Sequence, residues 1–229
     1  MKTSKEKPEH LAALHADCTF HVYNRTNNQE ILFRDDNDRR YFLKKYAMHV
    51  APYLYTLSYC LLDNHFHLLV RIKSEEDILA IVVEIPKEVQ TVAHQHFLQM
   101  PEDGRSVHEV LERQFSRLFT AYAMYFNTRW KRKGNLFYRP FKRLPVRDEA
   151  HFTRLIYYIH NNPEKHRISD DFTKWRWSSY QALASEQPTL LARSEVLAWF
   201  GGQAEFINFH QELHDSDSIA SLLFEEVGN

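Results

Sequence analysis

Runs of β-branched and aromatic residues along the chain alternate with longer segments whose apolar residues recur at helical spacing. Residues 18–24, 53–62 and 65–72 are rich in Val, Leu, Tyr and Phe, which predicts three strands. Asp63 and Asn64 supply turn chemistry between the last two runs. These two strands are therefore predicted to form a hairpin.

Helical periodicity follows the first strand and returns after the hairpin. Predicted helices cover 38–51, 75–85, 87–98 and 107–130, with Asp35 to Asn37 as N-cap candidates and Pro52 and Pro86 as breaks. Residues 136–146 form a short extended segment interrupted by prolines. Asp148 and Glu149 then open a helix that is predicted to end at about Asn162, before Pro163.

The order of these elements predicts a βαββαβ unit, hence an α+β fold with a ferredoxin-like antiparallel sheet and helices on one face. Residues 16–168 would form this domain. Residues 1–15 are predicted to be a flexible N-terminal arm. Residues 169–229, with a helix near 195–200, are predicted to be a C-terminal helical extension packed on the core.

Composition excludes several classes of protein. The 229 residues include five glycines, too few and too scattered for a Gly-rich nucleotide or phosphate loop. Two cysteines cannot form a disulfide framework or a four-cysteine zinc site. The sequence contains no apolar run that could span a membrane and no signal-peptide core, so a cytoplasmic location is expected.

The charge pattern is more informative than the net charge of −1. Residues 113–147 contain ten Lys or Arg and no Asp or Glu, whereas residues 205–229 contain six acidic residues and no Lys or Arg. This separation predicts a face that binds a polyanion. Aromatic residues interleave with the basic ones and could stack on bases or fill the core: Tyr125, Phe126, Trp130, Phe137, Tyr138 and Phe141. The core is favoured for Phe126 and Phe141.

The first candidate for chemistry is the pair His65 and His67, separated by Phe66. Residues i and i+2 of a strand share a face, so the two imidazoles could bind one divalent cation or be unrelated surface histidines. His94 and His96 diverge on a helix and are given no role. His210 and His214 share a helical face in the acidic C-terminal region and are expected to be exposed.

The second candidate is Tyr158 with Asn162, four residues apart on one helix face. A tyrosine hydroxyl can act as a covalent nucleophile, and an amide oxygen can bind a metal ion. Spacing alone does not favour Tyr158 over the adjacent Tyr157.

Several stretches together resemble the REP-associated tyrosine transposases, bacterial members of the single-tyrosine HUH transposases. The resemblance covers residues 18–180 and is carried, in family order, by HVYNRTNNQEILF (21–33), YCLLDNHFHLLV (59–70), FNTRWKRKGNLFYRPFKR (126–143), YYIHNNPEKH (157–166) and WSSY (177–180). It implies the HUH nuclease fold, with His65 and His67 as metal ligands, Asn162 as the third ligand and Tyr158 as the nucleophile.

The resemblance also implies an activity. Mg²⁺ or Mn²⁺ would assist cleavage and rejoining of single-stranded DNA at hairpin-forming repeats, through a 5′-phosphotyrosine intermediate. The basic residues expected to hold the DNA are Arg129, Lys131, Arg132, Lys133, Arg139, Lys142 and Arg143. A monomer or homodimer near the bacterial nucleoid is expected.

Two other functions compete with DNA cleavage. A domesticated protein could bind structured DNA without cleaving it, although the complete set of His65, His67 and Tyr158 disfavours this. A zinc-dependent hydrolase is the weakest hypothesis, because the sequence contains no H-E-x-x-H motif.

Overall fold

A four-stranded antiparallel sheet forms the centre of the computed structural model, which describes residues 8–215. Its strands are β1 (Thr19–Arg25), β2 (Leu54–Leu61), β3 (His65–Ile72) and β4 (Lys142–Val146). The strand order is β2-β3-β1-β4, and every neighbouring pair is antiparallel. This topology confirms the predicted α+β class with a ferredoxin-like sheet.

The helices agree with the predicted periodicity over most of the chain. They are α1 (Asp36–His49), α2 (Glu75–Glu84), α3 (Val92–Gln99), α4 (Val107–Arg129), α5 (Glu149–Lys165), α6 (Tyr180–Leu183), α7 (Arg193–Phe200) and α8 (Gln203–Asp215). None of these helices within residues 8–215 is long and apolar enough to cross a membrane.

Two predicted helix boundaries were wrong. The segment 87–98 is a 3₁₀ turn at Lys87–Val89 followed by α3, whose start is capped by the Thr91 side chain. Pro163 lies inside α5, which continues to Lys165. A proline in the last turn removes only one helical hydrogen bond, so the helix tolerates it there.

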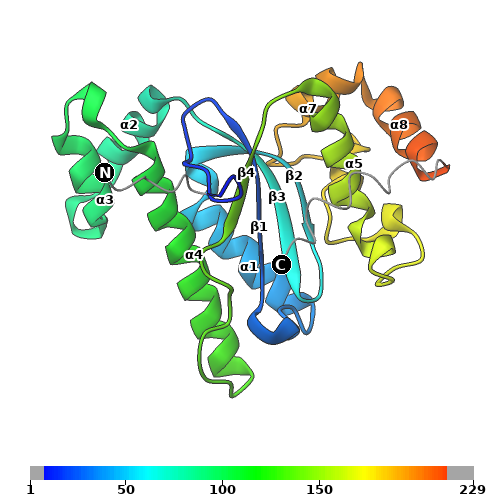
Figure 1. The fold of residues 1–229 in the computed structure, drawn as a ribbon, viewed down its shortest axis with the longest axis horizontal. Coiled ribbons are helices and arrows are strands. Elements are labelled where there is room, and N and C mark those ends of the chain that lie inside the picture. Colours follow the sequence, from blue (N-terminus) through cyan, green and yellow to red (C-terminus); the bar gives the residue numbers. More distant parts are fainter. Residues whose placement is uncertain (1–7, 216–229) are drawn as a thin grey trace, which may run out of the picture.

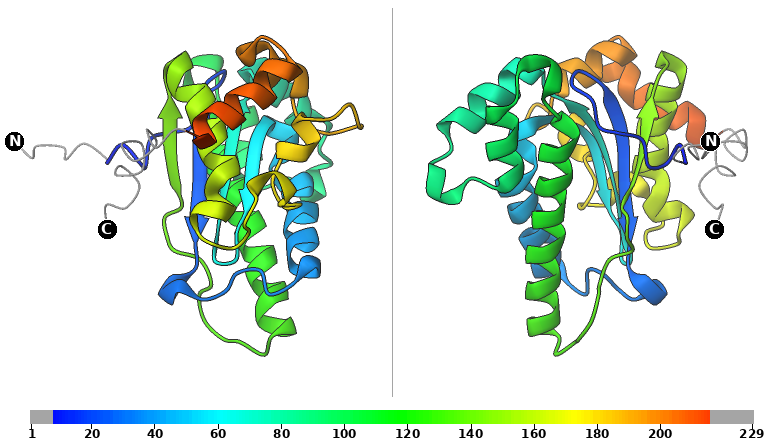
Figure 2. Two further views of the ribbon diagram at one scale, coloured as in Figure 1. Left: turned by 90° about the vertical axis from the view of Figure 1, so that its right-hand side faces the viewer. Right: turned by 60° about the vertical axis from the view of Figure 1, so that its left-hand side comes forward.

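One face of the sheet is covered by α1 and α4 (Figures 1 and 2). The even-numbered residues of β1 and β3, apart from Asn24, join Phe42 of α1 in the larger apolar core. The members from α4 include Phe115, Tyr122 and Phe126, all fully buried. Alternation along the strands therefore separates an apolar face from the face that carries the histidines.

The opposite face is covered by α5, with α7 and α8 beyond it (Figures 1 and 2). The expectation of helices on one face thus holds for α1 and α4 but not for α5. A second apolar core explains this arrangement, because Leu57, Cys60 and Leu69 of the sheet pack with Ile156 of α5 and Phe206 of α8. The helix α5 and the C-terminal extension share this core.

The N-terminal segment was predicted to be flexible as far as residue 15, and residues 8–15 do not behave as an arm. Leu14 is 1% exposed in the larger core, and Leu11 forms a β-bridge with Arg143. The Arg143 backbone N–H also donates to the His10 carbonyl. Residues 1–7 of the predicted arm and residues 216–229 of the predicted extension lie outside the described residues.

A buried histidine pair links α8 to α5, which corrects the expectation that His210 is exposed. His210 is 0% exposed, and its Nδ1 is 2.8 Å from the Phe206 carbonyl oxygen, which can only accept a hydrogen bond. The His210 Nε2 therefore accepts from His160 Nδ1 at 2.9 Å, and His160 Nε2 accepts from the Ser179 hydroxyl at 2.8 Å. Burial lowers the pKa of His210 to about 4, and burial followed by repulsion from His210 lowers the pKa of His160. The pair is neutral and structural. His214, as expected, is exposed and bonds Glu164.

Candidate active site

The odd-numbered residues of β1 and β3, apart from Leu69, form a polar patch on the face that α5 covers. In the β1–β3 register, Tyr23 is opposite His67 and Arg25 is opposite His65. The His65 and His67 rings are 5.1 Å apart between centroids, and His21 stacks on His67 at a centroid distance of 5.1 Å. Strand pairing therefore places the predicted histidine pair beside residues 40 or more positions earlier in the sequence.

Hydrogen bonds determine which nitrogen each histidine offers to a cation. His65 Nδ1 lies 2.6 Å from the Asn64 Oδ1, which can only accept, so Nδ1 carries the proton and Nε2 keeps a lone pair. His67 Nδ1 lies 2.9 Å from His21 Nε2. Because Nδ1 is engaged in both residues, Nε2 is the atom through which either could bind a metal ion.

Helix α5 places Tyr158 against this patch and Tyr157 in the core. The Tyr158 ring stands at 83° to the His67 ring with centroids 5.7 Å apart, and the Lys165 Nζ lies 5.0 Å from the Tyr158 ring centroid. Tyr157 is 1% exposed and packs against Phe172 and His210. The structure thus distinguishes the two tyrosines, which spacing alone did not.

A cavity of about 390 Å³ opens at this patch, and we call it the histidine cleft. It is lined by Tyr23, Asn24, Arg25, Thr26, Gln29, Asn64, His65, His67, Tyr138, Pro140, Lys142, Tyr158, Lys165 and His166. None of these described lining residues is acidic, whereas Arg25, Lys142 and Lys165 are cationic. Such a cleft attracts phosphate.

Asn162, the predicted third ligand, lies one helical turn after Tyr158 and is fully buried. Its Nδ2 donates to the Tyr158 carbonyl at 2.7 Å. Its Oδ1 is buried and has no hydrogen-bond partner within residues 8–215. A buried amide oxygen without a partner suits a metal ligand, although Asn162 does not line the histidine cleft.

The candidate donor set is smaller than the four protein ligands of a structural zinc site. Within residues 8–215, no group of three or more His, Cys, Asp or Glu is arranged to hold a metal. Two imidazole nitrogens and one neutral amide oxygen leave several positions for water or phosphate oxygens, which Mg²⁺ and Mn²⁺ accept. The zinc-hydrolase hypothesis gains no support from this arrangement.

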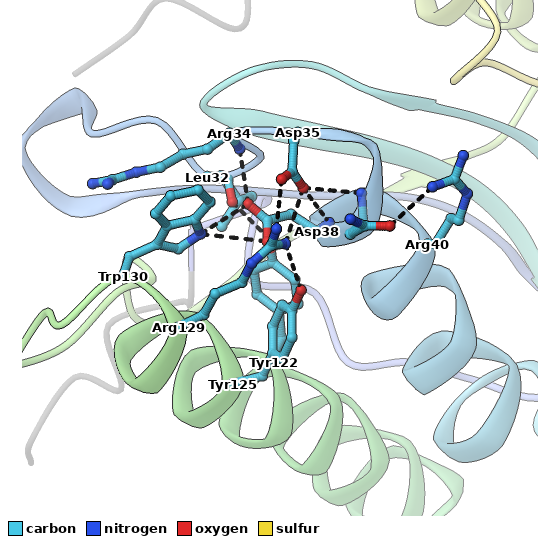
Figure 3. A network of polar contacts seen from close by, with 10 residues as sticks. Leu32, Arg34, Asp35, Asp38, Arg40, Tyr122, Tyr125, Arg129 and Trp130 are labelled. Carbon is cyan, nitrogen blue, oxygen red and sulfur yellow. Dashed lines mark hydrogen bonds and ion pairs between the residues drawn. The ribbon is translucent and has the colours of Figure 1, made fainter.

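Three of the predicted DNA-binding arginines are engaged within the protein. Figure 3 shows Arg129 between α4 and α1, where its guanidinium bonds Asp35 at 2.6 Å and Asp38 at 2.7 Å. Partial burial raises the pKa of Asp35, but hydrogen bonds from Arg129 and from backbone amides outweigh this and lower it. Asp35 is also the N-cap of α1, so Arg129 fixes the start of that helix.

Arg132 and Arg143 are engaged in the same way. Arg132 makes a bidentate pair with Glu30, at 2.5 and 2.7 Å. Arg143 is 3% exposed and donates to the Ala12 carbonyl. The remaining predicted positions are at or near the surface: Lys131, Lys133 and Arg139 are exposed, and Lys142 is half-buried in the histidine cleft.

The predictions for the aromatic residues of the basic segment are partly confirmed. Phe126 and Phe141 are buried, as favoured from the sequence, and Phe137 is buried with them. Tyr138 is 46% exposed, lines the histidine cleft and carries the Arg25 guanidinium over its ring. It is therefore the most exposed of these aromatic residues.

Sequence reasoning missed two histidines at this site. His21 lies on β1, and only the pairing of β1 with β3 brings it to His67. His166 follows α5, with its ring 4.9 Å from that of His65, and partial burial followed by the Lys165 charge lowers its pKa. Two residues on an expected strand, His21 and Tyr23, did share the i, i+2 spacing that identifies a common face.

No protein-family model and no curated protein matches the chain. A solved structure of a REP-associated tyrosine transposase bound to a REP hairpin is similar at 12% sequence identity, with a TM-score of 0.47. The alignment covers 82% of this chain and 90% of that chain. A similarity of this size assigns no role to any residue here. The protein is defined by its own topology as an α+β protein with a ferredoxin-like sheet and a cleft that joins histidines to a tyrosine.

Proposed function

We propose that the protein cleaves and rejoins single-stranded DNA through a covalent bond between Tyr158 and a 5′-phosphate. The observation that carries this proposal is the packing of Tyr158 against His67, in a cleft that also contains His65 and is lined by cationic side chains. The ordered motifs that resemble REP-associated tyrosine transposases support it independently.

In the proposed reaction the Tyr158 hydroxyl attacks the scissile phosphorus in line with the departing 3′ oxygen. The phenolic proton passes to water as the O–P bond forms, and the 3′ oxygen takes up a proton from water as its bond to phosphorus breaks. Lys165, 5.0 Å from the ring centroid, would stabilise the developing phenolate. Attack by a free 3′-OH reverses the step, and the phosphotyrosine conserves the bond energy without a nucleotide cofactor.

The residues that would hold Mg²⁺ or Mn²⁺ are His65 and His67 through Nε2, with Asn162 through Oδ1. When bound, such a cation neutralises charge on the scissile phosphate. Asn64 and His21 keep the Nδ1 atoms of the two histidines engaged and so orient both rings.

The proposed substrate is a hairpin formed by a repeat in single-stranded DNA. Arg25, Lys142 and Lys165 would bind phosphates in the histidine cleft, and Tyr138 would stack on an unpaired base. The exposed Lys131, Lys133 and Arg139 extend this basic surface. We expect the protein to act in the bacterial cytoplasm on chromosomal repeats, as a monomer or homodimer.

The test is covalent capture of labelled DNA. The purified protein is incubated with single-stranded hairpin repeats from its host and Mn²⁺ or Mg²⁺, and then denatured. We expect a denaturation-resistant band that is absent from Tyr158→Phe and present in Tyr157→Phe, the matched control. A band that persists in Tyr158→Phe refutes the assignment. If the protein binds the hairpin but gives no denaturation-resistant band with Mg²⁺ or with Mn²⁺, it is a non-catalytic DNA-binding protein instead.

A further inference from the structure

A second cavity is also lined by Tyr158. It has a volume of about 200 Å³ and lies along β4 and the first turns of α5. Its lining includes Arg147, His151, Arg154 and His21, and Tyr158 lines both this cavity and the histidine cleft. We call it the Arg154 cleft. Tyr158 therefore forms part of the partition between two cavities, and the His21–His67 hydrogen bond forms another part.

The charges of the Arg154 cleft suit a phosphate. Arg154 is exposed and has no hydrogen-bond or ion-pair partner within residues 8–215. The two acids that line this cleft are already engaged: Asp148 caps α5 by accepting from the His151 backbone N–H at 2.7 Å, and Glu9 pairs with Arg147 at 3.6 Å. The Glu9–Arg147 pair is largely exposed, so it is weak and a phosphate can displace Glu9.

We propose that the Arg154 cleft binds the DNA strand that continues from the scissile phosphate on the side away from the histidine cleft. This inference rests on the proposed function. A strand whose phosphate meets the Tyr158 hydroxyl must leave that point in both directions. Tyr158 lines both cavities, which follow one another along β1 and β4: the pair His21 and Leu144 borders one, and the pair Tyr23 and Lys142 borders the other. Arg154 and Arg147 contact phosphates of one flank, and Lys142 and Lys165 contact those of the other.

The test measures binding of hairpin DNA in EDTA, so that cleavage plays no part. Three oligonucleotides are compared: one with single-stranded flanks on both sides of the cleavage position, and two that each lack one flank. The double variant Arg147→Ala/Arg154→Ala is compared with the wild type. The control, Arg40→Ala/Lys44→Ala, removes two exposed charges from α1 on the opposite face of the sheet.

We expect the Arg147/Arg154 variant to bind the two-flank oligonucleotide about tenfold more weakly, with a salt slope shallower by about 1.4 for two lost phosphate contacts. It should bind one of the truncated oligonucleotides as well as the wild type does, and that oligonucleotide identifies the flank. Equal weakening with all three oligonucleotides, or weakening no larger than the control's, overturns the proposal. If the covalent-capture experiment gives no Tyr158 adduct in the wild type, the proposed function is overturned. The dependence of DNA binding on one flank would then stand as a separate result.

Discussion

The two faces of the sheet differ in what their side chains do. Towards α1 and α4, the residues of β1 and β3 are apolar apart from Asn24 and fill one continuous core, as with Phe20, Phe66 and Leu68. Towards α5, the same strands present His21, Tyr23, His65 and His67 at one end and Leu69 further along. One pair of strands therefore supplies both the main core and the candidate active site.

This difference shows where a site can form on such a fold. The α5 helix needs apolar contacts to stay on the sheet, and it obtains them through a second core shared with the C-terminal extension. The sheet end beyond that core is filled by polar rings with a cavity beside them. Buried polar groups need partners, and the hydrogen bonds among Asn64, His65, His21 and His67 provide them.

The largest expected effects come from substitutions at two adjacent positions of β3, one on each face of the sheet. Phe66→Ala should lower the free energy of unfolding by about 3–5 kcal/mol, because Phe66 is fully buried in the main core. His65→Ala should change it by less than about 1 kcal/mol and reduce DNA cleavage at least about 100-fold. Urea unfolding and adduct formation measure the two effects. Equal loss of stability in both variants would contradict the division between the faces.

The buried histidine pair makes the second core sensitive to pH. The pKa of His210 is about 4 in the folded protein and near its ordinary value of 6.5 when unfolded. The unfolded state therefore binds more protons between these values, and stability is full above about pH 6.5 and falls as pH drops towards 4. His210 alone should account for about 3 kcal/mol of this loss.

The variant His210→Phe should be less stable at pH 7, because His160 loses an acceptor, and should have a shallower pH dependence. Urea unfolding between pH 7 and pH 4 gives the slope for each protein. An unchanged slope in His210→Phe would show that another group controls the pH dependence.

A third pair of variants separates structural from DNA-binding cations. Arg129→Gln should lower the midpoint of thermal unfolding, because Asp38 is fully buried and loses its ion-pair partner. Lys142→Gln should leave that midpoint nearly unchanged and should weaken DNA binding a few-fold, with a salt slope shallower by about 0.7. Calorimetry and fluorescence anisotropy make the comparison. A larger loss of DNA affinity in the folded Arg129→Gln protein would reverse these roles.

The smallest expected effect concerns Glu30 and Arg132. The hydrogen bond from Arg132 outweighs partial burial and lowers the pKa of Glu30, so the pair stabilises the protein above about pH 4.5 and loses this effect below it. Glu30→Gln should cost about 0.5–1 kcal/mol at pH 7 and less as the pH falls through the lowered pKa of Glu30. The difference in unfolding free energy between the two proteins at each pH provides the check. A difference that does not shrink as the pH falls would indicate a packing effect rather than an ion pair.

Local patterns predicted the strands and the hairpin, because alternation and turn residues are encoded within a few positions. They also placed His65 and His67 on one face. The ion pair of Arg129 with Asp35 could not be predicted from local sequence patterns, because Asp35 lies 94 positions earlier. The same holds for His21, which meets His67 only through strand register, and for His210, whose burial depends on packing against α5. Charge density identified the basic segment, but not which of its members have acidic partners.

The most direct measurement is the identity of the residue that becomes linked to DNA. The covalent product is digested with protease and nuclease, and the peptide that carries the nucleotide is sequenced by mass spectrometry. Tyr158 lines the histidine cleft, whereas Tyr157 does not line it and is 1% exposed. The predicted result is a 5′-phosphonucleotide on Tyr158. A nucleotide on Tyr157 or any other residue, or the absence of a modified peptide, would contradict the proposed function.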